Sequence, residues 1–462
     1  MDRFVDRETE LERLVDCYAS ADPEMVVIFG RRRLGKTRLV EQSLSNREDA
    51  VIFQATETTP HVQLEEFTDV AAEPFPGIAQ IKQDWEALLG YLGEQDAIVV
   101  LDEFPYLVDA DESLPSKIQR LWDHRLTETA GTLILVGSSI SMMEDATLLG
   151  NSPLYGRFTE KLDLRPLPFS AAQEFVPDDY TPEERIFASG IFGGVPYYLD
   201  GVDLEHGLAS AIVEDVLSRD GYLHNEPEYI LRTELREPNR YFAILSAIAA
   251  GKSTGNEIAQ WVGIDAKHLS TYTQKLARLR LIEREVPITE EKAKSRRGRY
   301  RLLDPMFRFW FRFVYGNEDR YERVGQAAYR EIIEPQLADF VSQEFEVLCA
   351  RALPQLYSLR TFIDIGRWWY KQHEVDVVGR TVDGTIVVGE CTFTNAPLEY
   401  GALSSLEAHT AEIPWTADRD GNETEYALFT RSGATQAVHE GVEERDGVRL
   451  FDLEEVIGHL QK

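Results

Sequence analysis

The chain has 462 residues, of which 43% are hydrophobic, and its formal net charge at pH 7 is −32. This length and composition allow about three globular domains, and no apolar run approaches the ~20 residues that a membrane-spanning helix requires. The strong negative charge argues against a surface that binds nucleic acid throughout.

The charged residues also indicate the solvent to which the chain is adapted. Only 11 of its 48 basic residues are lysine, and the rest are arginine. An acid-rich, lysine-poor composition keeps a protein hydrated where salt screens its self-repulsion, so we expect a halophilic protein. The first residues, MDRFVDRETE, are too charged for a secretory signal, and three widely spaced cysteines predict free thiols. These features favour the cytoplasm.

The clearest chemical motif is MVVIFGRRRLGKT, residues 25–37. Five apolar residues predict a buried strand, a glycine-rich turn follows, and a helix continues from there. Backbone N–H groups in such a turn line a concavity that holds phosphate, and the helix N-terminus adds partial positive charge. Lys36 would reach the β- and γ-phosphates, and the Thr37 hydroxyl would ligate Mg²⁺. We therefore predict a Walker A loop that binds ATP through Gly30, Arg31, Arg32, Arg33, Leu34, Gly35, Lys36, Thr37 and Arg38.

A second strand motif, AIVVLDEF at residues 97–104, ends in two carboxylates. Asp102 at the carboxyl end of this strand would hold Mg²⁺ through water. Glu103 would act as the general base that polarises the attacking water. The four apolar β-formers ahead of the pair, downstream of a Walker A loop, identify it as a Walker B motif.

A third long apolar strand is expected at TLILVGSS, residues 132–139. Alternating strands and helices imply a parallel sheet whose ligand lies at the carboxyl ends of the strands. A polar residue at this strand end would sense the γ-phosphate, and the candidates are Ser138 and Ser139.

Two later segments also bear on the nucleotide. In PLYGRF, residues 153–158, Arg157 lies on a loop where it would act as an arginine finger, in cis or on a neighbouring subunit. A surface ion pair is the equal alternative for Arg157. In GIFGGVPYYL, residues 190–199, Gly194 and Pro196 would shape a small helical lid.

The character of the chain changes over residues 238–304, where three helices precede a pair of short strands. This order is typical of a winged helix-turn-helix. Ten basic and four acidic residues lie between Lys275 and Arg301, a local charge of +6 within an acidic chain. We expect backbone contacts with DNA through Arg296, Arg297 and Arg299. A winged helix used only for protein packing is the alternative.

The last part of the chain predicts an aromatic helix at residues 305–325 and then a further α/β domain. Glu346 lies on an expected helix, and Asp376 and Glu390 lie on two expected strands. Carboxylates on neighbouring elements can hold a divalent metal that acts on a phosphodiester. In so acidic a chain, composition alone also produces this spacing.

The order of these parts resembles an archaeal family of STAND/AAA+-type P-loop ATPases. Members are similar to origin-recognition ATPases fused to a C-terminal domain related to archaeal Holliday-junction resolvases. The resemblance implies ATP and Mg²⁺ as cofactors, DNA as a partner, and Phe4, Val5 and Arg7 near the adenine, although a plain capped helix would also account for that N-terminal segment.

The resemblance extends to the PD-(D/E)XK nuclease motif, with one departure. Glu346, Asp376 and Glu390 match its acids, but Thr392 occupies the position of its lysine. That lysine normally stabilises the charged phosphate, so its absence argues against nuclease activity. Lys371 is a candidate to supply the charge instead.

We therefore expect an α/β protein that combines a P-loop NTPase parallel sheet, a helical lid, a winged helix-turn-helix and a restriction-endonuclease-like α/β domain. The expected parts are a P-loop ATPase core over 1–165, a lid over 166–235, a winged helix over 236–304, a connector over 305–330 and a PD-(D/E)XK-like domain over 331–462. An ATP-driven switch acting on DNA, alone or as an oligomer, is the leading hypothesis. An ATP-gated metal-dependent nuclease and a nucleotide-sensing scaffold are the alternatives.

Overall fold

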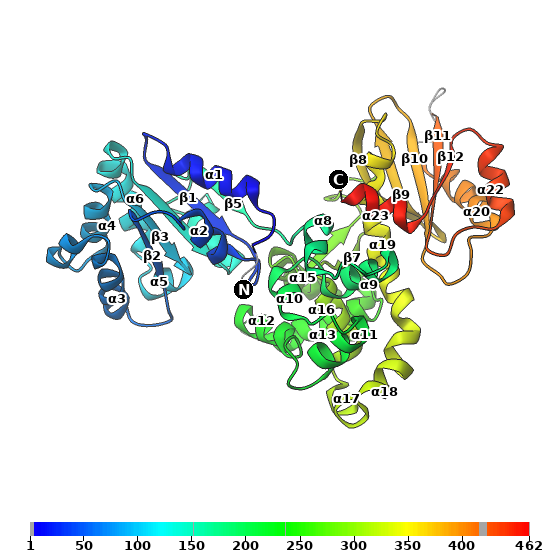
Figure 1. The fold of residues 1–462 in the computed structure, drawn as a ribbon, viewed down its shortest axis with the longest axis horizontal. Helices are drawn as coiled ribbons and strands as arrows, with labels where there is room; N and C mark the ends of the chain where they lie inside the picture. The colour runs from blue at the N-terminus through cyan, green and yellow to red at the C-terminus, as the bar shows by residue number, and fades with distance from the viewer. Residues whose placement is uncertain (1–3, 151, 236, 415–422, 462) are drawn as a thin grey trace. The chain divides into compact units, whose positions relative to one another are not determined.

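The computed structural model describes residues 4–150, 152–235, 237–414 and 423–461. The chain divides into two compact units, Met1–Pro166 and Leu167–Lys462 (Figure 1). Within the described ranges, no helix is both long and apolar enough to cross a bilayer. All three cysteines are free thiols, as the sequence predicts.

The first unit is built on a five-stranded parallel sheet with strand order β2-β3-β4-β1-β5. Its strands are β1 (Glu24–Phe29), β2 (Ala50–Gln54), β3 (Ile98–Asp102), β4 (Thr132–Gly137) and β5 (Glu160–Asp163). Its helices are α1 (Glu8–Tyr18), α2 (Lys36–Ser43), α3 (Pro60–Ala72), α4 (Trp85–Gly93), α5 (Phe104–Ala110), α6 (Leu114–His124) and α7 (Ile140–Met143). This is the α/β sheet of a P-loop NTPase, so the predicted fold class is confirmed here.

The strands of this sheet are apolar along both faces because helices cover both. In β1, Met25, Val27 and Phe29 point into one core with α3, α4 and α6, whereas Val26 and Ile28 are buried on the opposite face. Such continuous apolar runs are typical of parallel strands. Since β4 lies between β1 and β3, the carboxyl ends of these three strands adjoin.

The second unit begins with a helical region that extends from α8 to α12. These helices are α8 (Phe169–Ala172), α9 (Pro182–Phe192), α10 (Pro196–Gly201), α11 (Leu208–Ala211) and α12 (Glu226–Glu234). Gly194 approaches the first residue of this unit closely: the Leu167 amide donates to the Gly194 carbonyl over 2.7 Å, and a Cβ on Gly194 would lie 2.2 Å from the Leu167 carbonyl oxygen. Only glycine fits there, while Pro196 opens α10 at a position that tolerates proline.

Three helices and an antiparallel strand pair follow, in the order that the sequence predicts. They are α13 (Pro238–Ala249), α14 (Gly255–Val262), α15 (Ala266–Arg278), β6 (Ile282–Glu285) and β7 (Arg299–Leu302). We call residues 282–302 the wing.

The single aromatic helix expected over residues 305–325 is instead two helices. They are α16 (Pro305–Phe309), which continues as a π-helical turn to Val314, and α17 (Glu318–Val324). The chain breaks at Gly316, whose φ of 79° is left-handed and incompatible with a helix. Trp310 and Phe313 are buried, so the segment is a core connector, as expected.

The last region contains a mixed five-stranded sheet of order β12-β11-β10-β9-β8. Its elements are α18 (Gln326–Ala328), α19 (Glu334–Leu356), β8 (Phe362–Tyr370), β9 (His373–Thr381), β10 (Ile386–Thr392), α20 (Tyr400–Thr410), β11 (Thr424–Thr430), α22 (Gln436–Glu443), β12 (Val448–Phe451) and α23 (Leu453–Leu460). The helix α19 contacts β8, β9 and β10, and α20 contacts β9 and β10. The three predicted acids therefore lie on elements in contact with one another, Glu346 on α19, Asp376 on β9 and Glu390 on β10.

Candidate nucleotide-binding site

The loop between β1 and α2 is the segment in which the sequence predicts a phosphate-binding cradle. Gly35 has a φ of 82°, a left-handed conformation that glycine adopts without strain, and α2 begins at the next residue. Lys36 is buried, and its Nζ donates to the carbonyl oxygens of Gly30 at 3.0 Å and Arg31 at 2.9 Å. The ammonium thus folds back over the loop, and successive backbone N–H groups of such a glycine-rich turn can receive phosphate.

Thr37 and Asp102 bring two oxygen ligands together beside this loop. The Thr37 hydroxyl donates to Asp102 Oδ2 over 2.6 Å, and the Glu103 amide donates to Asp102 Oδ1 over 2.8 Å. Burial raises the pKa of Asp102, and these two hydrogen bonds oppose the rise. Hard oxygen ligands at the foot of a phosphate loop fit Mg²⁺ bound with a nucleotide.

Glu103 and Ser138 meet at the ends of neighbouring strands. Ser138 Oγ donates to Glu103 Oε1 over 2.6 Å, and the Ser138 amide lies 3.4 Å from Oε2. Glu103 has a φ of 51°, so the chain turns sharply after β3 and presents this carboxylate at the sheet edge. Of the two sensor candidates, Ser138 is therefore the one in contact with the predicted base, and Ser139 is the N-cap residue of α7.

The remaining loop residues have separate environments. Arg32 donates to the Tyr106 hydroxyl over 3.0 Å, Arg33 has a left-handed φ of 73°, and Leu34 is buried. Arg38, on the first turn of α2, forms an exposed ion pair with Glu41.

Arg157 forms a bidentate ion pair with Asp123 at 2.9 and 2.8 Å and also donates to the Pro153 carbonyl oxygen at 2.9 Å. This is the ion-pair alternative left open by the sequence. A role as an arginine finger would require release from Asp123. At the N-terminus, Arg7 forms an ion pair with Glu10.

The predicted DNA contacts on the wing have different surroundings. Arg296 is exposed. Arg297 forms an ion pair with Glu290, and its guanidinium lies 4.9 Å from the centre of the Tyr370 ring. Of the three predicted DNA-contacting arginines, Arg296 alone is exposed, whereas Arg297 and Arg299 are half-buried.

Arg299 is committed to the hairpin of β8 and β9. It forms an ion pair with Glu374 at 2.8 Å and stacks 4.7 Å over the Trp369 ring. The wing also bonds to β8 through the backbone, since the Ile288 amide donates to the Arg367 carbonyl oxygen over 2.9 Å. Part of the wing therefore packs on protein, which is the alternative raised for this segment.

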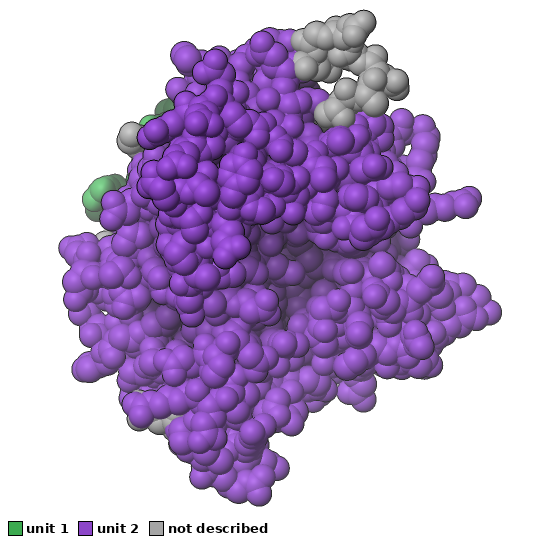
Figure 2. Space-filling view, turned by 90° about the vertical axis from the view of Figure 1, so that its right-hand side faces the viewer, with its two compact units in different colours: residues 1–166 green, residues 167–462 purple. Residues whose placement is uncertain are grey.

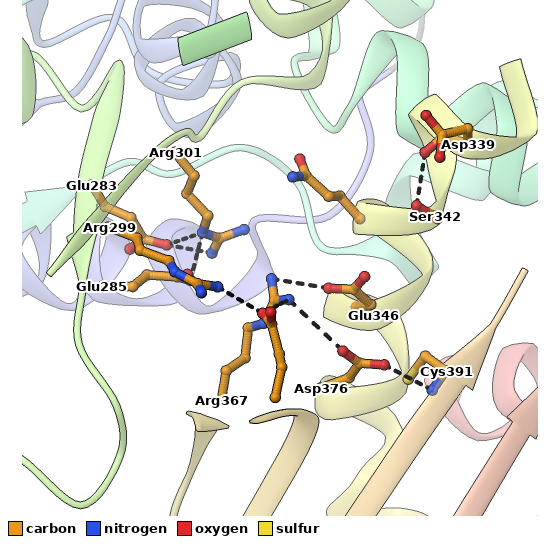
Figure 3. A network of polar contacts seen from close by, with 12 residues as sticks. Glu283, Glu285, Arg299, Arg301, Asp339, Ser342, Glu346, Arg367, Asp376 and Cys391 are labelled. Atoms are coloured by element: carbon orange, nitrogen blue, oxygen red, sulfur yellow. Dashed lines mark hydrogen bonds and ion pairs between the residues drawn. The ribbon is translucent and has the colours of Figure 1, made fainter. Parts of the chain in front are cut away.

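The predicted C-terminal acids gather around a half-buried arginine, Arg367, that sequence reasoning missed. Arg367 lies 2.9 Å from Glu346, 3.0 Å from Glu374 and 3.8 Å from Asp376 (Figure 3). Burial, reinforced by the charge of Asp376, raises the pKa of Glu346 to about 7 even though Arg367 opposes it.

Glu390 belongs to the same cluster. Its pKa is raised to about 7, by burial first and then by the charges of Asp376 and Glu346. In the part of the chain that the structure describes, however, no group of three or more acidic, histidine or cysteine side chains has the geometry to hold a metal ion. Arg367 supplies a positive charge beside Glu346 and Asp376, and a metal-binding role for Glu346, Asp376 and Glu390 stays a prediction.

The position of the nuclease lysine is filled as the sequence indicates, by Thr392 at the end of β10. Lys371 lies at the turn between β8 and β9, with its Nζ 5.0 Å from the centre of the Tyr370 ring. The cation that contacts the acids is Arg367 rather than Lys371.

Two family models match separate parts of the chain. A family described as an ATPase domain predominantly from Archaea matches residues 4–202, and one described as archaeal and bacterial proteins of unknown function matches residues 310–410. The uncharacterized protein MJECL04 of Methanocaldococcus jannaschii is 36% identical over 379 residues, which cover 81% of this chain and 84% of that protein.

Solved structures with related folds include two archaeal proteins. The Walker-type ATPase PABY2304 of Pyrococcus abyssi is 20% identical, with 67% of this chain and 96% of that chain covered and a TM-score of 0.47. The ORC2 protein of Aeropyrum pernix, solved as ADPNP and ADP complexes, is 14% identical, with 74% and 97% covered and a TM-score of 0.42.

Proposed function

The chain belongs to the family of MJECL04, with an N-terminal ATPase domain of the archaeal type, and from this premise we propose an ATP-driven switch that acts on DNA. The observation that carries the proposal is the contact between the Walker A and Walker B motifs, in which Thr37 bonds to Asp102 over 2.6 Å. Lys36, Glu103 and Ser138 lie on the adjoining segments, so the groups that phosphoryl transfer needs are close together.

In the proposed mechanism, Lys36 exchanges its loop carbonyl oxygens for the phosphates of ATP, and Thr37 and Asp102 are the residues that would hold Mg²⁺. The metal, when bound, neutralises phosphate charge. Glu103 orients a water molecule and accepts its proton, and the Ser138 hydroxyl holds the Glu103 carboxylate in place. This division of roles supports hydrolysis over passive nucleotide sensing.

The packing of α9 supports the coupling of the helical region to the rest of the second unit. This helix contacts both α16 and α19. Arg308 of α16 donates to the Gly190 carbonyl oxygen over 3.4 Å, and Ser189 lies 3.4 Å from Glu344 of α19. A displacement of α9 on nucleotide binding would therefore shift both neighbours. We propose that the region acts as a STAND- or AAA+-type lid.

The wing is the proposed DNA contact, and its arginines give the test. Replacing Arg296, Arg297 and Arg299 together by Ala is expected to weaken binding and to flatten the plot of log affinity against log salt. The slope should change by about one unit for each phosphate that the variant no longer neutralises. Fluorescence anisotropy of labelled duplex DNA over a salt series measures it. An unchanged slope would mean that the wing contacts protein alone.

The alternative of an ATP-gated nuclease is favoured only by the convergence of the three acids. We expect slow cleavage or none, because Arg367 occupies the acid cluster and Thr392 provides a dipole where a lysine would provide a full charge. Removal of one such electrostatic interaction typically costs about 10²–10³ in rate.

Incubation with linear and branched DNA in Mg²⁺ or Mn²⁺, beside an Asp376→Ala control, measures this activity. Rapid cleavage by the native chain that disappears in the control would overturn the expectation.

A further inference from the structure

A pocket of about 490 Å³ lies within the second unit, where the wing meets the turn between β8 and β9. The start of α14 forms part of its wall (Figures 1 and 2 show this unit as a ribbon and as a surface). Its lining includes five cations, Arg284, Arg296, Arg297, Arg299 and Lys371. None of its lining residues carries a carboxylate, although the chain as a whole has a net charge of −32. We call it the basic pocket.

Three of these cations form no ion pair with a carboxylate of the described residues. Among the described residues, no carboxylate lies within ion-pair distance of Arg284, Arg296 or Lys371. Arg284 donates only to carbonyl oxygens, those of Lys292 at 2.9 Å and Ser295 at 2.7 Å. Arg296 and Lys371 are exposed. The pocket lining thus carries positive charge that no carboxylate in the lining neutralises. A bound anion would reduce the repulsion between these cations.

The other two cations hold the walls together. Arg297 and Arg299 form ion pairs with Glu290 and Glu374. The Trp369 indole N–H donates to the Arg297 carbonyl oxygen over 3.0 Å, which fixes the ring at the pocket wall. The pocket is therefore built from folded, mutually bonded segments.

Two aromatic side chains, Tyr300 and Trp369, also line the basic pocket. Cations along a concave surface with aromatic rings beside them are the combination that holds single-stranded nucleic acid, because phosphates meet the cations and bases stack on the rings. The volume is that of a pocket for one small molecule, which suits a single nucleotide. The regular outer surface of a duplex cannot enter it.

We propose that the basic pocket binds the phosphate and base of an unpaired nucleotide within single-stranded nucleic acid. This inference rests on the proposed action on DNA and adds a strand-specific contact through Lys371, Tyr300 and Trp369, beside the wing arginines that also line the pocket. A duplex with a single-stranded end would then be held by the wing and the pocket together.

The test compares Lys371→Glu, an exposed pocket cation that lies outside the wing, with Arg323→Glu. The second variant has the same charge change at an exposed residue of α17, outside the pocket lining. Anisotropy is measured with a labelled oligothymidylate and with a blunt duplex, each also in the presence of inorganic phosphate. Circular dichroism confirms that both variants fold.

The proposal expects Lys371→Glu to lose at least about tenfold in affinity for the single strand, because a phosphate contact becomes a repulsion, and much less for the duplex, because the wing arginines are unchanged. The control variant should bind as the native chain does, and inorganic phosphate at equal concentration should not compete. An equal loss in both variants, or full competition by phosphate, overturns the proposal while DNA binding stands. Absence of binding to either DNA by the native chain overturns both.

Discussion

Lys36→Ala is expected to weaken the binding of ATP by about 10- to 100-fold. The Lys36 ammonium is buried in the loop, so it meets the phosphates with little competition from water. A hydrogen bond to a charged group is worth about 1.5–3 kcal/mol, which corresponds to this loss of affinity. Isothermal calorimetry with ATP and Mg²⁺ measures it directly.

The matched control is Lys82→Ala, which removes an exposed lysine of the same unit. Its affinity for ATP should equal that of the native chain. Since Lys36 also bonds to Gly30 and Arg31, thermal unfolding of both variants must show an intact fold. Native affinity in a folded Lys36→Ala chain would remove the Walker A assignment.

Glu103→Gln is expected to keep ATP binding and to slow hydrolysis at least tenfold, on the order of 1.4 kcal/mol of barrier. Glutamine retains the shape of the side chain and an oxygen that can accept the Ser138 hydroxyl hydrogen bond, but it cannot take a proton from water. A steady-state phosphate-release assay and calorimetry on the same preparation separate the two effects.

Glu112→Gln, an exposed substitution in the same unit, is the control and should leave both quantities unchanged. A Glu103→Gln chain that turns over ATP at the native rate would show that another group acts as the base.

The segments of the candidate nucleotide site were largely predictable because its motifs are local. Strand, loop and helix follow one another within residues 24–43, and the loop residues need no distant partner to be recognised. The closeness of Ser138 to Glu103 depends on the strand order, which places β4 beside β3. Sequence periodicity gives the strands, and their order follows from packing.

The second unit shows where such reasoning ends. The electrostatic role of Arg367 depends on pairing between β8 and β9. The turn after Tyr370 pairs Trp369 with Glu374. A regular hairpin that continued this register would place Arg367 opposite Asp376. The observed register becomes irregular between Gly366 and Trp368. The amino-acid composition of this segment does not by itself predict that β8 and β9 pair as a hairpin. Likewise, the basic pocket joins Arg297 to Trp369, which lie 72 residues apart and which no local pattern connects.

ATP turnover by the intact chain, measured with and without DNA, tests the central claim most directly. We expect Mg²⁺-dependent hydrolysis whose rate changes when DNA is added, and its loss in Glu103→Gln. Tight binding of ATP without turnover in either condition would contradict the account and identify the chain as a nucleotide-sensing scaffold.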